Sequence, residues 1–351
     1  MKTEILTWQQ SERIAEILRE GGIVCFPTET VYGLGCVSRS EAAFNRLVAI
    51  KKRPPEKPFT LMCATLTQVA MNAEVDAKAA AVLRAYMPGP ITALLKARPA
   101  VARFVTLGLP TIGVRVPDSP EVRSMIEKAG CPLLVPSANI SGEPAAKSFE
   151  EAKSVFDGVV DAIVDGECQG GRPSTIIDLS KGSISLVREG PISYSEIKSA
   201  YEKALPFKVA LASDHGGFAY KEAIKMHLVK AGYSPLDFGT NSTASCDYPL
   251  FAKDAAQAVA SHEADLGVLV CTSGEGISMA ANKVKGVRCG IGYDDVATGK
   301  TREHNNANMV AFGQAYMPLE DVLRRVDIFL LETFSIEKKH ARRVDQVNSI
   351  A

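Results

Sequence analysis

The second half of the chain alternates short apolar runs with longer amphipathic segments. Residues 209–212 of the expected strand 208–212 and all of 266–271 are apolar, which is typical of strands covered on both faces. Between them, residues 217–232 have the apolar period of a helix. The other elements predicted here are strands near 287–292 and 308–313 and a helix at about 318–333. Such alternation predicts a three-layer αβα sandwich with a parallel sheet and a site at the carboxyl ends of its strands.

The first half has a less regular pattern. We expect a helix at about 11–20, with Ser11 as its N-cap and Gly21-Gly22 as its stop. The other expected helices lie near 41–50, 67–86, 119–129 and 149–156. Strand-like apolar runs recur at 23–26, 111–116, 132–135, 162–165, 175–179 and 184–188. This pattern predicts an α/β domain with a twisted mixed sheet.

The two patterns meet near residue 205. Ser193 and Glu196 have the spacing of a capping box, which predicts a helix over 193–205. Pro206 ends that helix, and the strand at 208–212 begins directly after it. We therefore predict two domains, residues 1–205 and 206–351, with no flexible tether between them.

The composition and net charge of the chain favour a globular protein over a nucleic-acid-binding, membrane or secreted one. The chain has 351 residues, of which 46% are hydrophobic and 23% charged, as in ordinary globular proteins. Forty basic residues balance forty acidic ones, so no net charge attracts nucleic acid or a membrane. No apolar run has the ~18 residues of a membrane span. The first residues also lack the apolar stretch of a signal peptide.

The positions of the cysteines and histidines limit the kinds of chemistry expected in each half of the chain. The eight cysteines form no Cys-x-x-Cys pair, which disfavours a metal site and fits a reducing cytoplasm. All five histidines follow residue 205. Proton-transfer chemistry is therefore expected in the second half, and the first half must work without imidazole.

Three polar motifs stand out in the first half. Pro27–Gly35 (PTETVYGLG) follows an apolar strand, and its glycines let backbone N–H groups approach a ligand. Lys51, Arg53 and Lys57 lie around two stiffening prolines and can converge on one polyanion. Ser137-Ala138-Asn139 offers a hydroxyl and an amide after another strand. Each motif alone also fits a plain turn, a solvated basic face or a generic nucleic-acid patch, and only the combination points to an anion site.

In this order and spacing the motifs resemble the YrdC-like threonylcarbamoyl-AMP synthase family, whose hallmark is Lys-x-Arg-x-x-x-Lys with a later Ser-x-Asn. The resemblance covers about residues 8–195, with further matches in PGPIT at 88–92, TIGVRVP at 111–117, STI at 174–176 and VREG at 187–190. It implies a YrdC-like fold and a Mg²⁺-ATP-dependent condensation of L-threonine with bicarbonate. The products would be threonylcarbamoyl-AMP and pyrophosphate. The carbamoyl group would then pass to adenosine 37 of tRNA, which makes the tRNA-modification machinery a downstream partner.

The same resemblance implies roles for individual residues. ATP would be held by Lys51, Arg53, Lys57, Thr111, Ser137, Asn139 and Arg188. Threonine would be held by Thr30, Arg115 and Ser174. Met62 stands where some relatives have a histidine that helps to hold the amino acid. Cations and hydroxyls suit this reaction, because charge accumulates on the triphosphate and no proton relay is needed.

Titratable side chains of the second half follow the predicted strands. Asp214 and His215 come after the first strand, and Asp247-Tyr248 follow a later one. Cys271 ends the strand at 266–271 and leads into the glycine-rich loop 272–276. A thiol among backbone N–H donors has a lowered pKa, and the same donors stabilise an oxyanion. Such a loop also occurs as a plain phosphate cradle. His227 and His262 are expected on helices with structural roles.

Over residues 207–347 the motifs SDHGGF, DFGT, DYP, CTSGEGISMAANK, REHNNAN and HARRVD resemble ribose-5-phosphate isomerase of the B type. The resemblance implies a Rossmann-like fold and cofactor-free interconversion of ribose 5-phosphate and ribulose 5-phosphate through an enediolate. His304 would open the ring with Asp247 nearby, and Cys271 would move the proton between C2 and C1. Ser273 and the backbone amides at Gly274 and Gly276 would stabilise the enediolate. The other sugar-phosphate contacts would come from Asp214, His215, Tyr248, Asn305, Lys339, His340 and Arg343.

Three positions depart from the isomerase pattern. Ala315 and Lys339 replace arginines that hold the phosphate in the family, which leaves Arg343, and Arg342 beside it, for that role. Lysine is a point charge where arginine forms a bidentate fork, so phosphate recognition is weakened. Glu275 adds a negative charge beside the thiol and opposes thiolate formation.

Two interpretations follow from the sequence. In the first, the chain is a bifunctional enzyme that forms a homodimer through its second half, because the isomerase family builds its site across a dimer. In the second, an RNA- or nucleotide-binding module is fused to a sugar-phosphate sensor or to an isomerase of another phosphorylated sugar.

Overall fold

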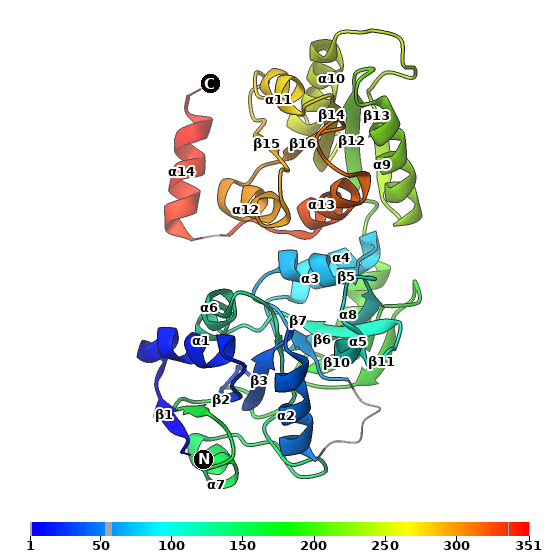
Figure 1. Cartoon of the computed structure of the whole chain (residues 1–351). Helices are drawn as coiled ribbons and strands as arrows, with labels where there is room; N and C mark the ends of the chain where they lie inside the picture. The colour runs from blue at the N-terminus through cyan, green and yellow to red at the C-terminus, as the bar shows by residue number, and fades with distance from the viewer. Residues whose placement is uncertain (1, 53–57, 336, 351) are drawn as a thin grey trace. The chain divides into compact units, whose positions relative to one another are not determined.

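In the computed structural model the chain divides into two units, which are described separately (Figure 1). The first comprises Met1–Glu74 and Ala81–Lys203, and the second comprises Val75–Ala80 and Ala204–Ala351. Residues 2–52, 58–335 and 337–350 are described by the structure. The division after Lys203 lies two residues before the boundary predicted from the sequence, and nothing in the sequence pattern indicates that Val75–Ala80 joins the second unit.

A mixed sheet forms the centre of the N-terminal unit. Over the described residues it has eleven strands in the order β1-β9-β2-β3-β8-β4-β7-β6-β10-β11, with β5 paired to β6. The strands are β1 (Glu4–Leu6), β2 (Val24–Phe26), β3 (Gly33–Val37), β4 (Leu61–Met62), β5 (Ala73–Glu74), β6 (Ile91–Ala97), β7 (Thr111–Arg115), β8 (Leu133–Leu134), β9 (Ala162–Val164), β10 (Thr175–Asp178) and β11 (Ser185–Arg188). β2 pairs with β9 in parallel and with β3 antiparallel, so the predicted mixed sheet is confirmed.

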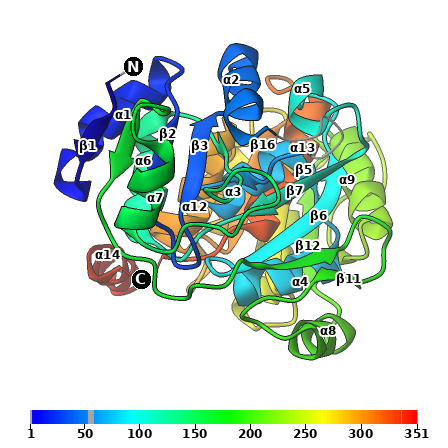
Figure 2. The ribbon, with the colours of Figure 1, turned by 90° about the horizontal axis from the view of Figure 1, so that it is seen from below.

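Helices cover this sheet. They are α1 (Ser11–Arg19), α2 (Glu41–Lys51), α3 (Leu66–Asn72), α4 (Ala77–Tyr86), α5 (Arg103–Thr106), α6 (Pro120–Ala129), α7 (Phe149–Phe156) and α8 (Tyr194–Glu202). α1 and α6 lie side by side (Figure 2). Ile14 and Leu18 of α1 and Val122 and Ile126 of α6 bury against β2, β8 and β9 in one apolar cluster. This cluster is the core of the unit.

Two local predictions for the N-terminal unit are wrong. Ser11 lies inside the first helix, because the 3-10 turn Trp8–Gln10 precedes it and is capped by Thr7. The helix expected over 67–86 is two helices, since Ala73–Glu74 leaves the helical path to pair with β6.

The C-terminal unit has a five-stranded sheet in the order β13-β12-β14-β16-β15, and every pair in it is parallel. The strands are β12 (Lys208–Ser213), β13 (Ser234–Asp237), β14 (Leu266–Cys271), β15 (Cys289–Ile291) and β16 (Met309–Gly313). Alternate residues bury on opposite faces: Val209 and Leu211 pack with α9 and α13, and Ala210 and Ala212 with α10 and α11. Both faces are therefore covered, and the predicted three-layer sandwich with a parallel sheet is confirmed.

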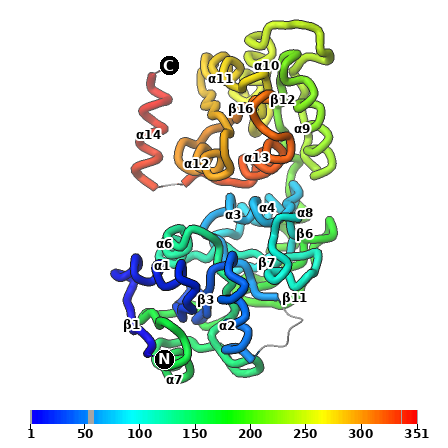
Figure 3. The backbone as a smooth tube through the Cα atoms, viewed as in Figure 1, coloured from blue at the N-terminus to red at the C-terminus, as the bar shows by residue number. Residues whose placement is uncertain are grey.

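The helices of this unit are α9 (Phe218–Lys230), α10 (Tyr248–Ala260), α11 (Glu275–Ala281), α12 (Asp295–Asn305), α13 (Leu319–Leu331) and α14 (Lys338–Asn348). α14 lies apart from the sheet, beside α12 (Figure 3). His227 lies on α9 and contacts Asp327, whereas His262 follows α10 in a turn with φ +61°, so its expected place on a helix is wrong. Within the described ranges no helix combines the length and apolar character that a membrane crossing requires.

Candidate active sites

A cavity of about 320 Å³ in the N-terminal unit brings together predicted ligand residues from distant parts of the sequence. They are Thr30, Thr111, Arg115, Ser137, Ser174 and Arg188. Thr30 lies in the loop between β2 and β3, whereas Arg188 ends β11. Arg53 and Lys57 lie outside the described residues. The cavity wall includes Pro58, which follows them directly.

Arg115 is the most buried cation of this cavity. Its guanidinium donates from Nη2 to Glu29 Oε1 at 2.7 Å and to Thr30 Oγ1 at 3.0 Å. The side chains of Arg115 and Glu29 are only 8% and 9% exposed. Arg115 Nε is buried and has no hydrogen-bond partner. Because an unpaired buried donor is costly, an acceptor from a ligand would stabilise this wall of the cavity.

A second cation lies close to the first. Arg188 donates from Nε and Nη2 to the backbone oxygen of Ser174, at 3.2 and 2.8 Å. Partial burial and the nearby charge of Arg115 lower the pKa of Arg188. Two guanidinium groups that repel each other across a cavity form a setting that an anion stabilises.

Lys51 and Asn139 do not line this cavity. They lie behind the loop that carries Ser137, where Lys51 Nζ contacts Asn139 Oδ1 at 2.7 Å. The structure thus separates the predicted ATP ligands into residues that line the cavity and residues that contact the loop of Ser137.

Sequence reasoning missed three polar residues of the site. Glu29 holds Arg115, Thr28 Oγ1 lies 2.9 Å from Thr30 Oγ1, and Thr92 Oγ1 lies 2.9 Å from Ser174 Oγ. All three belong to segments that resemble the YrdC-like family, PTETVYGLG and PGPIT. The family motifs therefore contain these residues, but only the packing of the folded chain shows which side chains of a motif contact the ligand residues.

In the C-terminal unit, one group of predicted residues gathers at the carboxyl edge of the sheet. Asp214 follows β12, Asp247 caps α10, and Cys271 ends β14. His215 Nδ1 lies 3.2 Å from the backbone oxygen of Cys246, which precedes Asp247. A Cβ at Gly276 would stand 2.8 Å from the ring of Tyr248, so the glycine loop and α10 are in close contact.

The thiol of Cys271 is 4% exposed and accepts the backbone N–H of Gly274 at 3.1 Å. Ser273 Oγ accepts the N–H of Glu275 at 3.3 Å. The N–H of Gly274 is therefore aimed at the sulfur. Cys271 is thus buried and is contacted by a backbone donor of the glycine-rich loop.

The second group of predicted residues lies around the end of α12 and the start of α14. The rings of His304 and His340 stack with centroids 4.1 Å apart and an interplanar angle of 13°. Asn305 and Arg343 line a cavity of about 750 Å³ between α14 and the body of the unit. Lys339 pairs with Glu337 at 2.8 Å on the surface.

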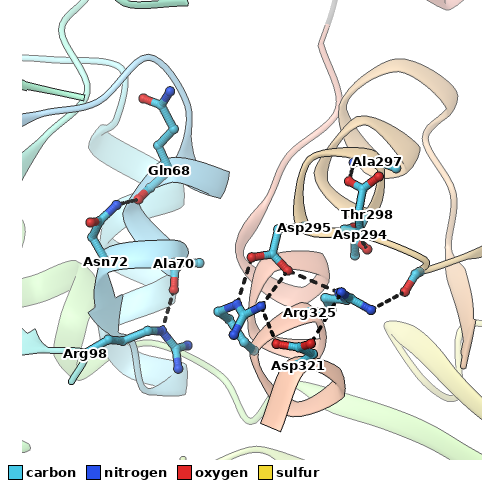
Figure 4. Close-up of polar contacts among 12 residues, drawn as sticks. Gln68, Ala70, Asn72, Arg98, Asp294, Asp295, Ala297, Thr298, Asp321 and Arg325 are labelled. Carbon is cyan, nitrogen blue, oxygen red and sulfur yellow. Dashed lines mark hydrogen bonds and ion pairs between the residues drawn. The ribbon is translucent and has the colours of Figure 1, made fainter. Parts of the chain in front are cut away.

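α12 is fixed at its other end by an ion-pair cluster with α13 (Figure 4). Asp295 accepts from Arg324 Nε at 2.8 Å and from Arg325 Nε at 3.2 Å. Arg324 also binds Asp321 at 2.6 Å. The carboxylate of Asp295 in the first turn of α12 is held by two arginines of α13. These ion pairs fix the position of α12 and with it that of His304.

The two groups lie at opposite edges of the sheet. α12 leaves the carboxyl end of β15 and returns to the amino end of β16, where Arg288 Nε contacts the backbone oxygen of Asn306. Cys271 pairs with Gly313 at the carboxyl end. The four residue steps of β16 span about 13 Å at ~3.3 Å each, too far for one sugar phosphate to bridge within one chain. Within one chain, His304, Asn305, Lys339, His340 and Arg343 therefore do not lie beside Cys271 at the strand carboxyl ends.

A substitution at Gly274 tests the close contact between the glycine-rich loop and β16. Gly274 has φ +84°, and a Cβ there would lie 2.9 Å from the backbone of Phe312. We expect Gly274→Ala to reduce the stability of the unit by about 1–3 kcal/mol and to displace the N–H from Cys271. Gly286→Ala is a matched control, since Gly286 has φ +86° but no neighbour within 4 Å. Calorimetric unfolding should show a smaller loss for the control; equal losses would contradict the close contact at Gly274.

Comparison with known proteins places both units in families. Residues 16–190 match the family model of Sua5, YciO and YrdC proteins, described as telomere recombination. Residues 209–347 match the model described as ribose/galactose isomerase. The N-terminal unit therefore belongs to the Sua5/YciO/YrdC family and the C-terminal unit to the ribose/galactose isomerase family, so the chain is a fusion of the two.

Individual relatives agree with this division. The threonylcarbamoyl-AMP synthase of Pyrococcus abyssi is 38% identical over 186 residues, which are 52% of this chain and 55% of that protein. The chain spans about half the length of the curated relatives that it matches first. The crystal structure of YciO from Escherichia coli is 31% identical with a TM-score of 0.51, and the match covers 55% of this chain and 98% of that one. The ribose-5-phosphate isomerase B of Clostridium thermocellum is 41% identical, with 41% of this chain and 97% of that chain covered and a TM-score of 0.40.

Within the described residues, His, Cys, Asp and Glu side chains do not gather in groups of three or more that could hold a metal ion. The eight cysteines are all free thiols.

Proposed function

We propose that the N-terminal unit is a threonylcarbamoyl-AMP synthase. The observation that carries the proposal is the cavity with Arg115, whose Nε lacks a partner, beside Arg188. Two cations and several hydroxyls are suited to a carboxylate next to a polyphosphate. The curated relatives named threonylcarbamoyl-AMP synthase support the same activity.

In this proposal Arg115, Thr30 and Ser174 hold L-threonine, with the carboxylate on Arg115. The amine of threonine condenses with bicarbonate to a carbamate with loss of water, and a carbamate oxygen attacks the α-phosphorus of ATP. The bond from the α-phosphorus to the bridging oxygen breaks, and pyrophosphate leaves with the electron pair. Arg188, with Arg53 and Lys57 from outside the described residues, neutralises the charge that builds on the phosphates. Thr111 and Ser137 complete the ATP contacts.

Mg²⁺ would enter with the triphosphate, whose oxygens are ligands that this ion prefers. It would add positive charge at the leaving pyrophosphate. The product would serve the modification of adenosine 37 in tRNA by downstream proteins.

Pyrophosphate release tests the synthase proposal. We expect the purified chain to release pyrophosphate from ATP only when threonine and bicarbonate are both present, and to form threonylcarbamoyl-AMP in equal amount by mass spectrometry. Release that is independent of threonine, or binding of RNA without any release, would favour a nucleotide- or RNA-binding module instead.

We further propose that the C-terminal unit is a sugar-phosphate isomerase that works as a homodimer. Cys271 lies near Asp214, Asp247 and Tyr248 at one edge of the sheet, whereas His304 and His340 lie at the other. A second copy related by a two-fold axis can place its His304 opposite Cys271, and the same contact then forms twice. The exposed side chain of Arg343 beside this histidine pair provides the phosphate ligand.

In each completed site His304 takes the ring-hydroxyl proton and Cys271 moves the proton between C2 and C1. Ser273 and the amides at Gly274 and Gly276 stabilise the enediolate. Asp247 assists ring opening, and the chemistry needs no cofactor. A reducing compartment such as the cytoplasm, which is part of the proposal, would keep Cys271 a free thiol.

The pH profile tests the role of His304. Burial, then the charge of Lys300, lowers the pKa of His304 below its ordinary value of 6.5. The neutral imidazole, which accepts the ring proton, therefore persists to lower pH than in a free histidine. We expect kcat/KM for isomerisation to decline on the acid side with an apparent pKa below 6.5. An apparent pKa above that value would contradict His304 as the base.

One observation favours a second candidate for the sugar substrate. Ala315 is exposed and uncharged where the family has an arginine, and Lys339 is paired with Glu337. A weaker phosphate clamp suits a substrate held mainly by its hydroxyls, such as a hexose phosphate. Turnover of ribose 5-phosphate, allose 6-phosphate and galactose 6-phosphate measured side by side would decide; the highest kcat/KM should belong to ribose 5-phosphate.

A further inference from the structure

The ammonium group of Lys51 is buried and is bound by the N-terminal unit itself. Lys51 is the last residue of α2 and is 2% exposed. Its Nζ lies 2.6 Å from the backbone oxygens of Ser137 and Asn139 and 2.7 Å from Asn139 Oδ1. Because an ammonium has three protons, it can donate to all three of these oxygens. The backbone oxygen of Lys51 also accepts the N–H of Ser141 at 2.9 Å.

These contacts determine the orientation of the Asn139 amide. Its Nδ2 donates to the backbone oxygens of Ile140 at 2.9 Å and Glu143 at 2.7 Å. Its Oδ1 accepts from Lys51, which is a donor only. A flipped amide would place N–H groups against the ammonium and an oxygen against two carbonyls. The oxygen of Asn139 therefore points to Lys51.

The amide in turn determines the direction of the Ser137 hydroxyl. Ser137 Oγ lies 2.7 Å from Asn139 Oδ1, which can only accept. The hydroxyl proton must point to that oxygen, so Ser137 presents lone pairs to the cavity that it lines. Turning the proton toward a phosphate would leave two acceptor oxygens facing each other at this short distance.

We propose, on the basis of the proposed synthase function, that Lys51 is a positioning residue and does not contact the nucleotide. It holds the loop 137–143 and keeps Ser137 as a hydrogen-bond acceptor. Ser137 then binds a hydroxyl or N–H group of the substrates, and the phosphates are bound by the other cations. The role differs from that of ATP ligand, which the resemblance implies for Lys51.

Hydrogen exchange of the ligand-free full chain tests the positioning role. We expect Lys51→Met to speed exchange of the amides at Asn139 and Ser141 by about tenfold or more, the effect of losing a hydrogen bond to a charged group. Lys52→Met is the matched control, because Lys52 is the exposed neighbour, and it should leave both amides unchanged. If Lys51→Met does not fold, Asn139→Leu removes one acceptor of the same ammonium and should give the same local effect. Unchanged exchange in the folded variant would overturn the proposal.

Nucleotide affinity gives a second readout. A positioning residue should change AMP and ATP affinity by a similar factor, whereas a direct ligand of the β- or γ-phosphate should weaken ATP far more than AMP. An ATP-selective loss in Lys51→Met would therefore overturn the proposal. Absence of ATP binding in the unsubstituted chain would instead count against the synthase function, and the exchange result would still decide the role of Lys51.

Discussion

Two inactive variants of the isomerase unit should restore activity when they form one dimer. Cys271→Ser removes the proton-transfer base and His304→Gln the ring-opening group, so each homodimer should lose ~10²–10⁴ in rate. A dimer with one chain of each kind has one site with both substitutions and one with neither. We expect it to show about half of the unsubstituted activity.

The heterodimer can be isolated by co-expression with two different affinity tags. A heterodimer of Cys271→Ser with the unsubstituted chain, which also keeps one intact site, should give the same value. If Cys271 and His304 of one chain formed the site, the mixed dimer would stay inactive. That result would contradict the placement of the two groups at opposite edges of the sheet.

The second large effect is expected at Arg115. Arg115→Met leaves the carboxylate of Glu29, which is 9% exposed, buried without its partner. Breaking a buried ion pair from one side costs about 3–5 kcal/mol, so the free energy of unfolding should fall by that amount. Threonine-dependent pyrophosphate release should be lost. Fluorescence of Trp8, the single tryptophan, follows unfolding of this unit alone.

The double variant Glu29→Gln/Arg115→Met separates stability from binding. It removes both charges and should recover much of the lost stability, whereas threonine-dependent release should stay absent. Glu29→Gln alone should raise the KM for threonine and leave the KM for ATP nearly unchanged. Full activity of the double variant would contradict Arg115 as the carboxylate ligand.

Much of the fold follows from local patterns. The uniformly apolar run at 266–271 predicts a strand covered on both faces, and the structure has β14 over the same residues. Ser193 predicts the start of α8, whose N-cap it is. Short strands such as β4 (Leu61–Met62) escaped prediction, because two residues are too few for a period and their strand state depends on pairing with β7 and β8.

The candidate sites, like the fold, follow only in part from the sequence. Resemblance brought Thr30, Arg115 and Arg188 onto one list, and the structure places all three around one cavity. A motif does not show where a side chain points. The resemblance therefore counts Lys51 among the ATP ligands, although its Nζ contacts the loop 137–143. Nor does spacing along the chain show that α12 carries His304 away from the edge where Cys271 lies. That separation depends on the parallel pairing of β15 with β16.

The most direct test of two independent enzymes in one chain measures both reactions in the same preparations. Unsubstituted protein, Arg115→Met and Cys271→Ser should each be assayed for threonine- and bicarbonate-dependent pyrophosphate release and for ribose 5-phosphate isomerisation. We expect both activities in the unsubstituted chain, loss of pyrophosphate release alone in Arg115→Met, and loss of isomerisation alone in Cys271→Ser. Absence of either activity in the unsubstituted chain, or loss of both through one substitution, would contradict two independent enzymes in one chain.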